Sequence, residues 1–393
     1  MLRRVMLSML AALAGSACPA GMSGRASGAT TPGLEWIRLG DDGARFVYAE
    51  SGTEFVAWGV NYDHDRSGRL IEDYWHDEWA AIVEDFAEIK ALGANVVRIH
   101  LQTGKFMKAP DEADVDALQQ LERLLKMAED TGVYLDLTGL GCYHKQDVPA
   151  WYDTLDEAAR WDVQARFWAA VATTCADSPA VFCYDLMNEP IVPGPKKKET
   201  DWLAGEFGGK YFVQRIALDL AGRTREEVAK AWVDKLASAI RKHDKRHLIT
   251  LGIIPWALHF YPGARQSLFY SKPVGEHLDF VSVHFYPEKG QLDKALDALS
   301  VYDLGKPLVI EEMFPLKCSA EELESFIDGS RAIAEGWISF YWGKTIDEYA
   351  AEEDSLTSAL VRTWLERFRA MTPAILGTAE AISRTITAPA EEQ

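Results

Sequence analysis

The sequence predicts an α/β fold: a single (β/α)8 TIM barrel with a short N-terminal β cap. Short and almost continuously apolar runs, typical of strands buried on both faces, recur from Phe55 to Trp342. Amphipathic stretches of helical period separate these runs. Strands that alternate with helices over most of a 393-residue chain favour one closed parallel barrel.

The elements are expected in the following order. Two or three short strands from Ile37, with turns at residues 40–43 and 50–52, form the cap and lead into the first barrel strand. Barrel strands are expected at residues 55–61, 94–101, 132–137, from 181 up to Asn188-Glu189-Pro190, and at 248–253, 280–286, 307–312 and 337–342. Helices are expected at residues 77–92, 115–130, 155–175, 225–242, 293–299, 320–334 and 355–370.

A doubly wound open sheet is the competing layout. Such a sheet normally carries a Gly-rich phosphate-binding turn after its first strand. The residues at this position are Asn61-Tyr62-Asp63-His64, which do not form that motif. We therefore prefer the barrel.

The N-terminus resembles an export signal. Arg3 and Arg4 precede an apolar run at residues 5–14, too short to span a bilayer, and small residues at 15–17 precede Cys18. We expect an exported protein, periplasmic or extracellular. Its expected parts are a signal peptide (1–17), a flexible tether (18–33), the barrel domain (34–375) and a C-terminal tail (376–393). Cleavage before Cys18 would create a lipid anchor, but Gly15 replaces the usual Leu, so anchored and freely secreted forms both stay open.

Composition narrows the class of partner. The net charge is −19 and the longest basic run is Lys196-Lys197-Lys198, so a nucleic-acid partner is not expected and binding to anionic membranes is disfavoured. The 13 tryptophans slightly favour carbohydrate, because indole rings offer flat surfaces to sugars. The sequence leaves open the oligomeric state. It also leaves open whether the later cysteines are paired or free; these are Cys142, Cys175, Cys183 and Cys318.

Polar side chains gather at the carboxyl ends of the predicted strands. In a parallel barrel these ends meet on one face, where enzymes of this fold place their active sites. So many polar groups in one ring suit a hydrogen-bonded site for a polyol ligand. The residues are Asn61, Asp63, Arg98, His100, Thr138, Asn188, Glu189, His284, Tyr286, Glu311, Glu312 and Trp342.

Two carboxylates in this ring, from strands four and seven, predict glycosidic bond hydrolysis. A pair about 5 Å apart suits double displacement, in which one acid protonates the leaving oxygen and the other carboxylate attacks the anomeric carbon. Glu189 is one member, and Glu311 or Glu312 is the other. Arg98 either keeps the nucleophile ionised or forms a structural pair with Asp136 or Asp185, and both roles are compatible.

The remaining strand-end residues fit supporting roles. Asn188 is expected to bind the hydroxyl next to the anomeric carbon, and Tyr286 to hydrogen-bond the nucleophile. Trp342 is either a platform under the sugar or a core residue. Metal-assisted hydrolysis is the rival chemistry, because His100 and His284 are near carboxylates. No metal-binding motif is present, and Arg98 places a cation beside His100, so neither a metal nor another cofactor is expected.

Several of these motifs together resemble family 5 glycoside hydrolases, the cellulase and mannanase group. The resemblance extends from about Trp36 to Arg369 and includes these motifs: Gly59-Val60-Asn61-Tyr62, Asn95-Val96-Val97-Arg98, Asn188-Glu189-Pro190, His284-Phe285-Tyr286, the strand-seven run Pro307 to Glu312, and Trp342. It implies that Glu189 is the acid/base. It also implies that Glu312, five residues after the proline, is the nucleophile.

The chain departs from the family pattern at two positions. Thr138 stands where family members commonly have His, and His144 is the candidate replacement. Met313-Phe314-Pro315 replaces the small residue that often follows the nucleophile motif. Both departures leave the catalytic pair intact but affect the expected sugar subsites.

The prediction is therefore a retaining glycoside hydrolase that acts on an oligo- or polysaccharide of the β-glucan or β-mannan type. The alternatives are an inactive carbohydrate-binding barrel and an exo-acting β-glycosidase or transglycosylase of the same clan. The insert at residues 191–224 carries aromatic residues and could close one end of the cleft; these are Trp202, Phe207, Tyr211 and Phe212. Endo and exo action, and the sugar itself, stay open.

Overall fold

The computed structural model describes residues 33–62, 68–255, 268–340, 342–352 and 355–377. The predicted signal peptide, most of the tether, Cys18, Asp63 and most of the predicted tail lie outside these ranges. Within the described ranges, no helix has the length and apolar character needed to cross a membrane.

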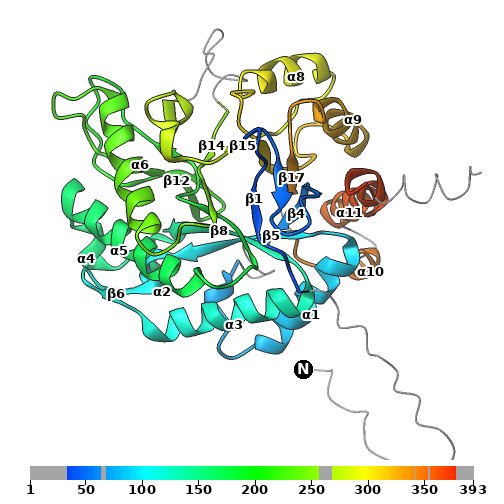
Figure 1. Cartoon of the computed structure of the whole chain (residues 1–393), viewed down its shortest axis with the longest axis horizontal. Coiled ribbons are helices and arrows are strands. Elements are labelled where there is room, and N and C mark those ends of the chain that lie inside the picture. Colours follow the sequence, from blue (N-terminus) through cyan, green and yellow to red (C-terminus); the bar gives the residue numbers. More distant parts are fainter. Residues whose placement is uncertain (1–32, 63–67, 256–267, 341, 353–354, 378–393) are drawn as a thin grey trace, which may run out of the picture. The chain divides into compact units, whose positions relative to one another are not determined.

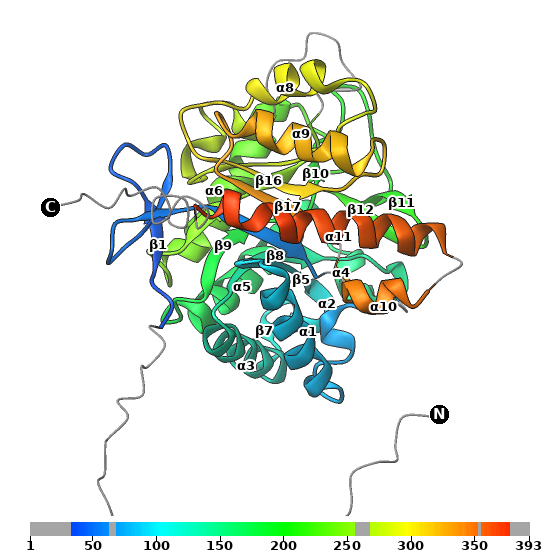
Figure 2. The ribbon, with the colours of Figure 1, turned by 90° about the vertical axis from the view of Figure 1, so that its right-hand side faces the viewer.

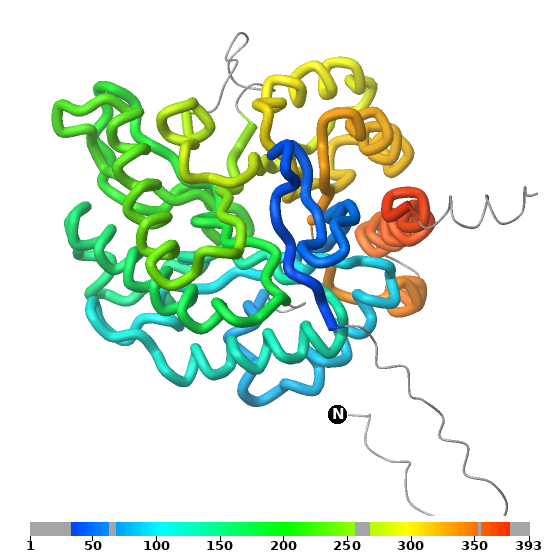
Figure 3. Tube along the Cα trace, in the orientation of Figure 1, coloured from blue at the N-terminus to red at the C-terminus, as the bar shows by residue number. Residues whose placement is uncertain are grey.

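The chain passes around the molecule from its blue N-terminal part to its red C-terminal part, as Figures 1 and 3 show. The centre of the fold is a parallel sheet in the order β13-β9-β8-β5-β4-β17-β16-β15-β14. Its strands are β4 (Ala57–Asn61), β5 (Val96–Gln102), β8 (Tyr134–Gly141), β9 (Val181–Asp185), β13 (Leu248–Thr250), β14 (Gly252–Ile253), β15 (Val281–His284), β16 (Leu308–Met313) and β17 (Gly336–Ser339). The two ends of this order, β13 and β14, are separated in the chain by Leu251 alone. The sheet therefore closes into the predicted barrel, and its fifth strand is interrupted at Leu251.

Helices connect the strands and cover the outside of the barrel. They are α1 (Trp79–Leu92), α3 (Val115–Thr131), α5 (Glu157–Cys175), α6 (Arg225–Arg241), α8 (Leu292–Ser300), α9 (Ala320–Ser330) and α11 (Leu356–Ile375). Their apolar faces pack on the outward side chains of the strands in one large core cluster, which includes Trp58, Trp168 and Trp232. The predicted succession of strands and helices is confirmed, and boundaries differ by only a few residues at most ends.

The first cap strands form a separate antiparallel sheet at the amino end of the barrel. β1 (Ile37–Leu39), β2 (Phe46–Tyr48) and β3 (Glu54–Phe55) pair in order. The buried ring of Phe46 makes edge contacts with Phe182 and Phe280 inside the barrel, at 5.1 Å between centroids in each case. The predicted cap is thus confirmed, and it fills the amino end with aromatic rings.

The insert after the fourth strand forms a small sheet that sequence patterns did not predict. β10 (Pro190–Ile191) pairs in parallel with β12 (Lys210–Arg215), which forms a hairpin with β11 (Leu203–Phe207). Figure 2 shows this hairpin at the opposite end from β1. The cap closes one end of the barrel, and the hairpin adjoins the carboxyl end.

Short elements complete the connections between strands. They are η1 (Ile71–Asp73), α2 (Thr103–Phe106), β6 (Met107–Ala109), β7 (Glu112–Ala113), η2 (Lys145–Asp147), α4 (Ala150–Asp153), η3 (Leu268–Tyr270), η4 (Gly275–His277) and α10 (Ile346–Ala350). The question of disulfides is also answered, because Cys142, Cys175, Cys183 and Cys318 are all free thiols.

Asp114 caps α3, and replacing it gives a test of local stability. Its side chain accepts hydrogen bonds from the backbone N–H groups of Asp116 (2.9 Å) and Ala117 (3.2 Å). We expect Asp114→Ala to lower the free energy of unfolding by about 1 kcal/mol in urea denaturation. Asp116 lies in the same turn, and its side chain takes no part in the described capping bonds, so Asp116→Ala is the control. Equal effects of the two substitutions would contradict the role of the cap.

Candidate active site

The carboxyl ends of the barrel strands bring the predicted polar residues together. Adjacent strands hold Asn61 beside Arg98 and Arg98 beside Asp136, so these side chains lie at one level of the barrel. Asp185 is paired with Thr138 one level further along the strands. A layer of charged residues therefore replaces the apolar filling of the lower barrel and forms the floor of the site.

Arg98 is the centre of this layer and is completely buried. Its Nη2 donates to Asp185 Oδ2 and Asn188 Oδ1, both at 2.9 Å, and its Nη1 donates to Asn61 Oδ1 at 2.9 Å. Nη1 also donates to Glu312 Oε1 at 2.7 Å. The guanidinium thus makes both the structural pair with Asp185 and the contact with the predicted nucleophile. These charge-assisted bonds fix the position of the Glu312 carboxylate.

Glu312 has a second donor on its other oxygen. The Tyr286 hydroxyl donates to Glu312 Oε2 at 2.9 Å. Burial, followed by the charge of Glu312, raises the pKa of Tyr286 well above its ordinary value, so this hydroxyl keeps its proton and acts as a donor. Glu312 is therefore held at both oxygens, and its side chain is still 9% exposed at the mouth of the barrel.

Glu189 lies opposite Glu312, with His284 between them. His284 Nδ1 is 2.9 Å from Glu189 Oε1 and 3.4 Å from Glu312 Oε2. One carboxylate oxygen of each glutamate and one nitrogen of His284 all lie within 4.8 Å of one another. The two carboxylates thus face a common space.

Two backbone features present Glu189 at this position. Its φ is +46°, a left-handed conformation that is uncommon for a residue with a side chain. Its N–H donates to the Gly252 carbonyl at 3.0 Å, which ties the turn after β9 to the fifth strand. The conformation is therefore held by a specific contact.

Glu311 and Glu312 differ clearly in their surroundings. Glu311 is fully buried inside the barrel, where Ser282 Oγ donates to its Oε2 at 2.5 Å, and its Oε2 lies 3.9 Å from Arg98 Nη2. The pairing of β16 with β17 is irregular between Ile310 and Met313, which lets two successive glutamates both approach Arg98. Of the two, only Glu312 reaches the mouth.

Comparison with known proteins identifies the family to which the chain belongs. The family model for cellulases, described as glycosyl hydrolase family 5, matches residues 50–321. The chain belongs to glycosyl hydrolase family 5. It is therefore a glycoside hydrolase, and its barrel is the barrel of that family.

Individual relatives of this family 5 protein are distant. Mannan endo-1,4-beta-mannosidase A of Podospora anserina is 22% identical over 270 residues, which are 62% of this chain and 64% of that protein. The chain thus spans less than two thirds of that relative. An exo-beta-1,4-mannosidase from Opitutaceae bacterium strain TAV5 matches with a TM-score of 0.62 and 16% identity, over 86% of this chain and 62% of that one. A beta-glucanase from Saccharophagus degradans in complex with cellotetraose matches with a TM-score of 0.56 and 17% identity, over 86% of this chain and 95% of that one. At these identities the structures establish the fold.

Thr138, which stands where family members commonly have His, and His144, the candidate replacement, have different surroundings. Thr138 is buried and its hydroxyl donates to Asp185 Oδ2 at 2.9 Å, so it supports the Arg98 network through Asp185. His144 is half-buried, and its Nε2 lies 3.2 Å from the Gly68 carbonyl oxygen. Its predicted role in place of the missing histidine stays a prediction.

The remaining predicted residues line or support the same centre. Asn61 is buried, and its Nδ2 donates to the carbonyls of Glu311 (3.0 Å) and Ser339 (3.2 Å), so its amide is used within the protein. Asn188 Nδ2 donates to the Phe212 carbonyl at 2.8 Å, which links it to the hairpin. Trp342 is 2% exposed, and its ring lies 6.0 Å from that of Tyr62; the sugar-platform role stays a prediction.

Two residues of the site were not predicted. The Tyr143 hydroxyl contacts His100 Nδ1, and His100 Nε2 lies 3.4 Å from Arg98 Nη1. The sequence offered one signal for Tyr143, namely its position just after the third barrel strand. The second residue that was not predicted is Gly252, whose carbonyl accepts the N–H of Glu189. Nothing in the sequence distinguishes it from a turn glycine.

Among the residues that the structure describes, two groups of side chains have polar atoms close enough to contact one cation. They are Asp136, Cys183 and Glu311, and Glu189, His284 and Glu312. Arg98 interacts with carboxylates of both groups and supplies a positive charge to them.

Proposed function

We propose that this protein is a retaining glycoside hydrolase that cleaves β-linked glucan or mannan glycans by double displacement. The observation that carries this proposal is the approach of Glu189 and Glu312, whose oxygens lie within 4.8 Å. Retaining enzymes separate their carboxyl groups by about 5 to 5.5 Å, whereas inverting enzymes need more room for a water molecule.

In the first step, Glu312 attacks the anomeric carbon while Glu189 donates its proton to the leaving oxygen. This forms a glycosyl ester on Glu312 and releases the shortened glycan. In the second step, Glu189 accepts a proton from water, which attacks the anomeric carbon and frees Glu312. Arg98 and Tyr286 position the nucleophile throughout, because each donates to a different oxygen of its carboxylate.

The hairpin of β11 and β12 supports an exo-acting form of this activity. It belongs to the insert that starts at Pro190, directly after Glu189. Tyr211 N–H donates to the Tyr143 carbonyl at 2.8 Å, and Asn188 Nδ2 donates to the Phe212 carbonyl. A wall fixed next to the acid/base would limit the length of glycan on that side of the scissile bond. The names of relatives include both an exo- and an endo-mannosidase, and a glucanase. We also propose that the protein is exported, from the signal-like residues 1–17.

The test is a panel of β-linked gluco- and manno-oligosaccharides, with product size and anomeric configuration followed by NMR. Release of single sugars or of the shortest products supports the exo form, and mixed internal products support the endo form. The first product should keep the β configuration. Binding without any hydrolysis would identify an inactive carbohydrate-binding barrel and overturn the proposal.

The acid/base role of Glu189 predicts a dependence on the leaving group. We expect Glu189→Ala to lower kcat/KM on natural oligosaccharides by about 10² to 10⁴-fold, because an alkoxide leaves poorly without a proton. Aryl glycosides with acidic phenols need little proton transfer and should lose far less. Steady-state kinetics on both substrates make the comparison. An equal loss on both would show that Glu189 acts in another way.

A further inference from the structure

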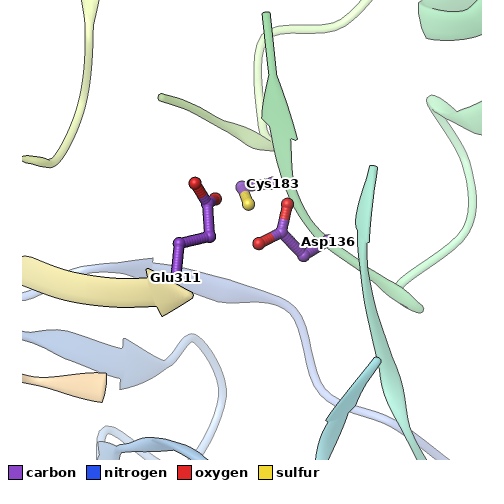
Figure 4. A group of neighbouring side chains, drawn as sticks. All are labelled: Asp136, Cys183 and Glu311. Carbon is purple, nitrogen blue, oxygen red and sulfur yellow. The ribbon is translucent and has the colours of Figure 1, made fainter. Parts of the chain in front are cut away.

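Below the catalytic pair lies a second pair of carboxyl groups that the mechanism above does not use. Asp136 on β8 and Glu311 on β16 are both completely buried, and with Cys183 their polar atoms lie within 4.8 Å of one another. Figure 4 shows the two carboxyl groups facing each other with Cys183 beside them. Neither Asp136 oxygen has a hydrogen-bonding partner among the described residues.

Two neighbouring carboxylates cannot both be ionised at low cost in a buried site. Burial, with the charge of Glu311, raises the pKa of Asp136 well above its ordinary value. Burial also opposes ionisation of Glu311, but attraction to Arg98 and His284 outweighs it and lowers the pKa of Glu311. Of the two carboxyl groups, Asp136 therefore holds a proton more tightly than Glu311.

Glu311 connects this pair to the catalytic centre through His284. Its Oε2 lies 3.6 Å from His284 Nε2, a buried nitrogen with no hydrogen-bond partner in the described part of the chain. The other ring nitrogen, Nδ1, faces Glu189 at 2.9 Å. The imidazole thus lies between a buried carboxylate and the acid/base.

Because Gly252 has no side chain, there is space beside it for the contact between Glu311 and His284. A Cβ atom at Gly252 would lie 2.4 Å from Glu311 Oε2 and 2.5 Å from His284 Nε2. Any side chain here would push the carboxylate and the ring aside. The same glycine accepts the N–H of Glu189 and donates its own N–H to Asp185 Oδ1 at 2.9 Å.

We propose that Glu311 is a positioning residue for the acid/base, and this rests on the proposed function. Its buried carboxylate holds the His284 ring with Nδ1 toward Glu189, and the neutral Asp136 leaves Glu311 to carry the negative charge. The ring then donates to Glu189 when that residue has given up its proton. Glu311 touches no sugar and acts only through His284.

Charged and titratable groups on several elements face the contact between Glu311 and His284. They are Arg98 on β5, Asp136 on β8, Cys183 and Asp185 on β9, Glu189 after it, Tyr286 after β15, Glu312 on β16, and Tyr270 on η3. Burial lowers the pKa of His284, but the charge of Glu312 and the neighbouring carboxylates of Glu189 and Glu311 raise it to about 10. Removing the charge of Glu311 should therefore lower the pKa of the ring.

The experiment compares Glu311→Gln, Asp136→Asn and Gly252→Ala with wild type. We expect Glu311→Gln to shift the basic limb of the kcat/KM profile to lower pH by about one unit or more, with KM little changed. Asp136→Asn exchanges a neutral donor for another and should leave both limbs in place. Gly252→Ala keeps all charges but separates Glu311 from His284, and it should shift the basic limb in the same direction as Glu311→Gln.

The titration of His284, followed by NMR of ring-labelled protein, is the second readout and does not depend on activity. In wild type the ring should stay protonated to about pH 9, and in Glu311→Gln it should lose its proton at lower pH. Thermal unfolding identifies any variant that does not fold, and Glu311→Asp, which keeps the charge, then replaces Glu311→Gln and should retain the wild-type limb.

The outcomes separate this inference from the proposed function. Unchanged limbs and an unchanged His284 titration in folded Glu311→Gln, with an active wild type, would overturn the positioning role. A shift in Asp136→Asn equal to that in Glu311→Gln would overturn the placement of the proton. Absence of hydrolysis by the wild type would overturn the proposed function, while the ring titration would still test the contact.

Discussion

Replacing Glu312 with Gln is expected to lower kcat by about 10⁴ to 10⁶-fold, the loss typical of removing a catalytic nucleophile. The amide keeps the size of the side chain, its oxygen can still accept from Arg98, and its NH2 group can donate to the Tyr286 hydroxyl oxygen, so the fold should be preserved. It cannot form the glycosyl ester. Circular dichroism and sugar binding should therefore match wild type while turnover is lost.

The neighbouring residue provides the matched control for this prediction. Glu311→Gln removes a carboxylate of the same size one position away, from a side chain that is fully buried. Its expected effect is a shift in pH dependence, with most of the activity retained at the new optimum. If Glu311→Gln lost activity as severely as we expect for Glu312→Gln and the latter stayed active, the two roles would be exchanged.

Replacing Arg98 with Met is expected to lower the free energy of unfolding by about 3 to 5 kcal/mol, because it leaves buried carboxylates without their cation. Arg98 donates to Asp185 and Glu312 and lies 3.9 Å from Glu311. Met occupies a similar volume, so the loss of charge dominates. Urea denaturation measures the effect.

The pH dependence of this loss has a definite sign. Without Arg98, the buried Asp185 and Glu311 should bind protons more tightly in the folded state than in the unfolded state. The variant then loses stability as pH rises above the ordinary carboxyl pKa of about 4, and the deficit should be smaller at pH 4 than at pH 8. Arg69→Met, which removes an exposed pair with Glu78, is the control and should cost no more than about 1 kcal/mol at either pH. A deficit independent of pH would contradict the charge argument.

The barrel could be predicted from the sequence because its signals are local. Apolar runs such as Val181–Asp185 identify buried strands, and amphipathic stretches identify the helices between them. Since parallel strands place their carboxyl ends on one face, the same reasoning brings Glu189 and Glu312 together without any knowledge of distances. Their separation of less than 4.8 Å follows from the closed barrel.

The buried contact between Glu311 and His284 could not be predicted, because it depends on irregularities in the pairing of the strands. The register shifts between Val283 and His284 on β15 and between Ile310 and Met313 on β16 set the directions of His284 and Glu311. The fifth strand also breaks at Leu251, which places Gly252 beside both residues. The hairpin of β11 and β12 was missed for a similar reason, since its Gly-rich sequence at Gly205 and Gly208-Gly209 lacks the pattern of a strand.

The central claim, that Glu312 attacks the anomeric carbon, is tested most directly by trapping the intermediate. A 2-deoxy-2-fluoro glycoside with a good leaving group slows the second step, so the glycosyl ester accumulates and its peptide can be identified by mass spectrometry. We predict a single sugar attached to Glu312, and none in Glu312→Gln. A sugar on Glu311, or turnover without any adduct and with inversion of configuration, would contradict the account.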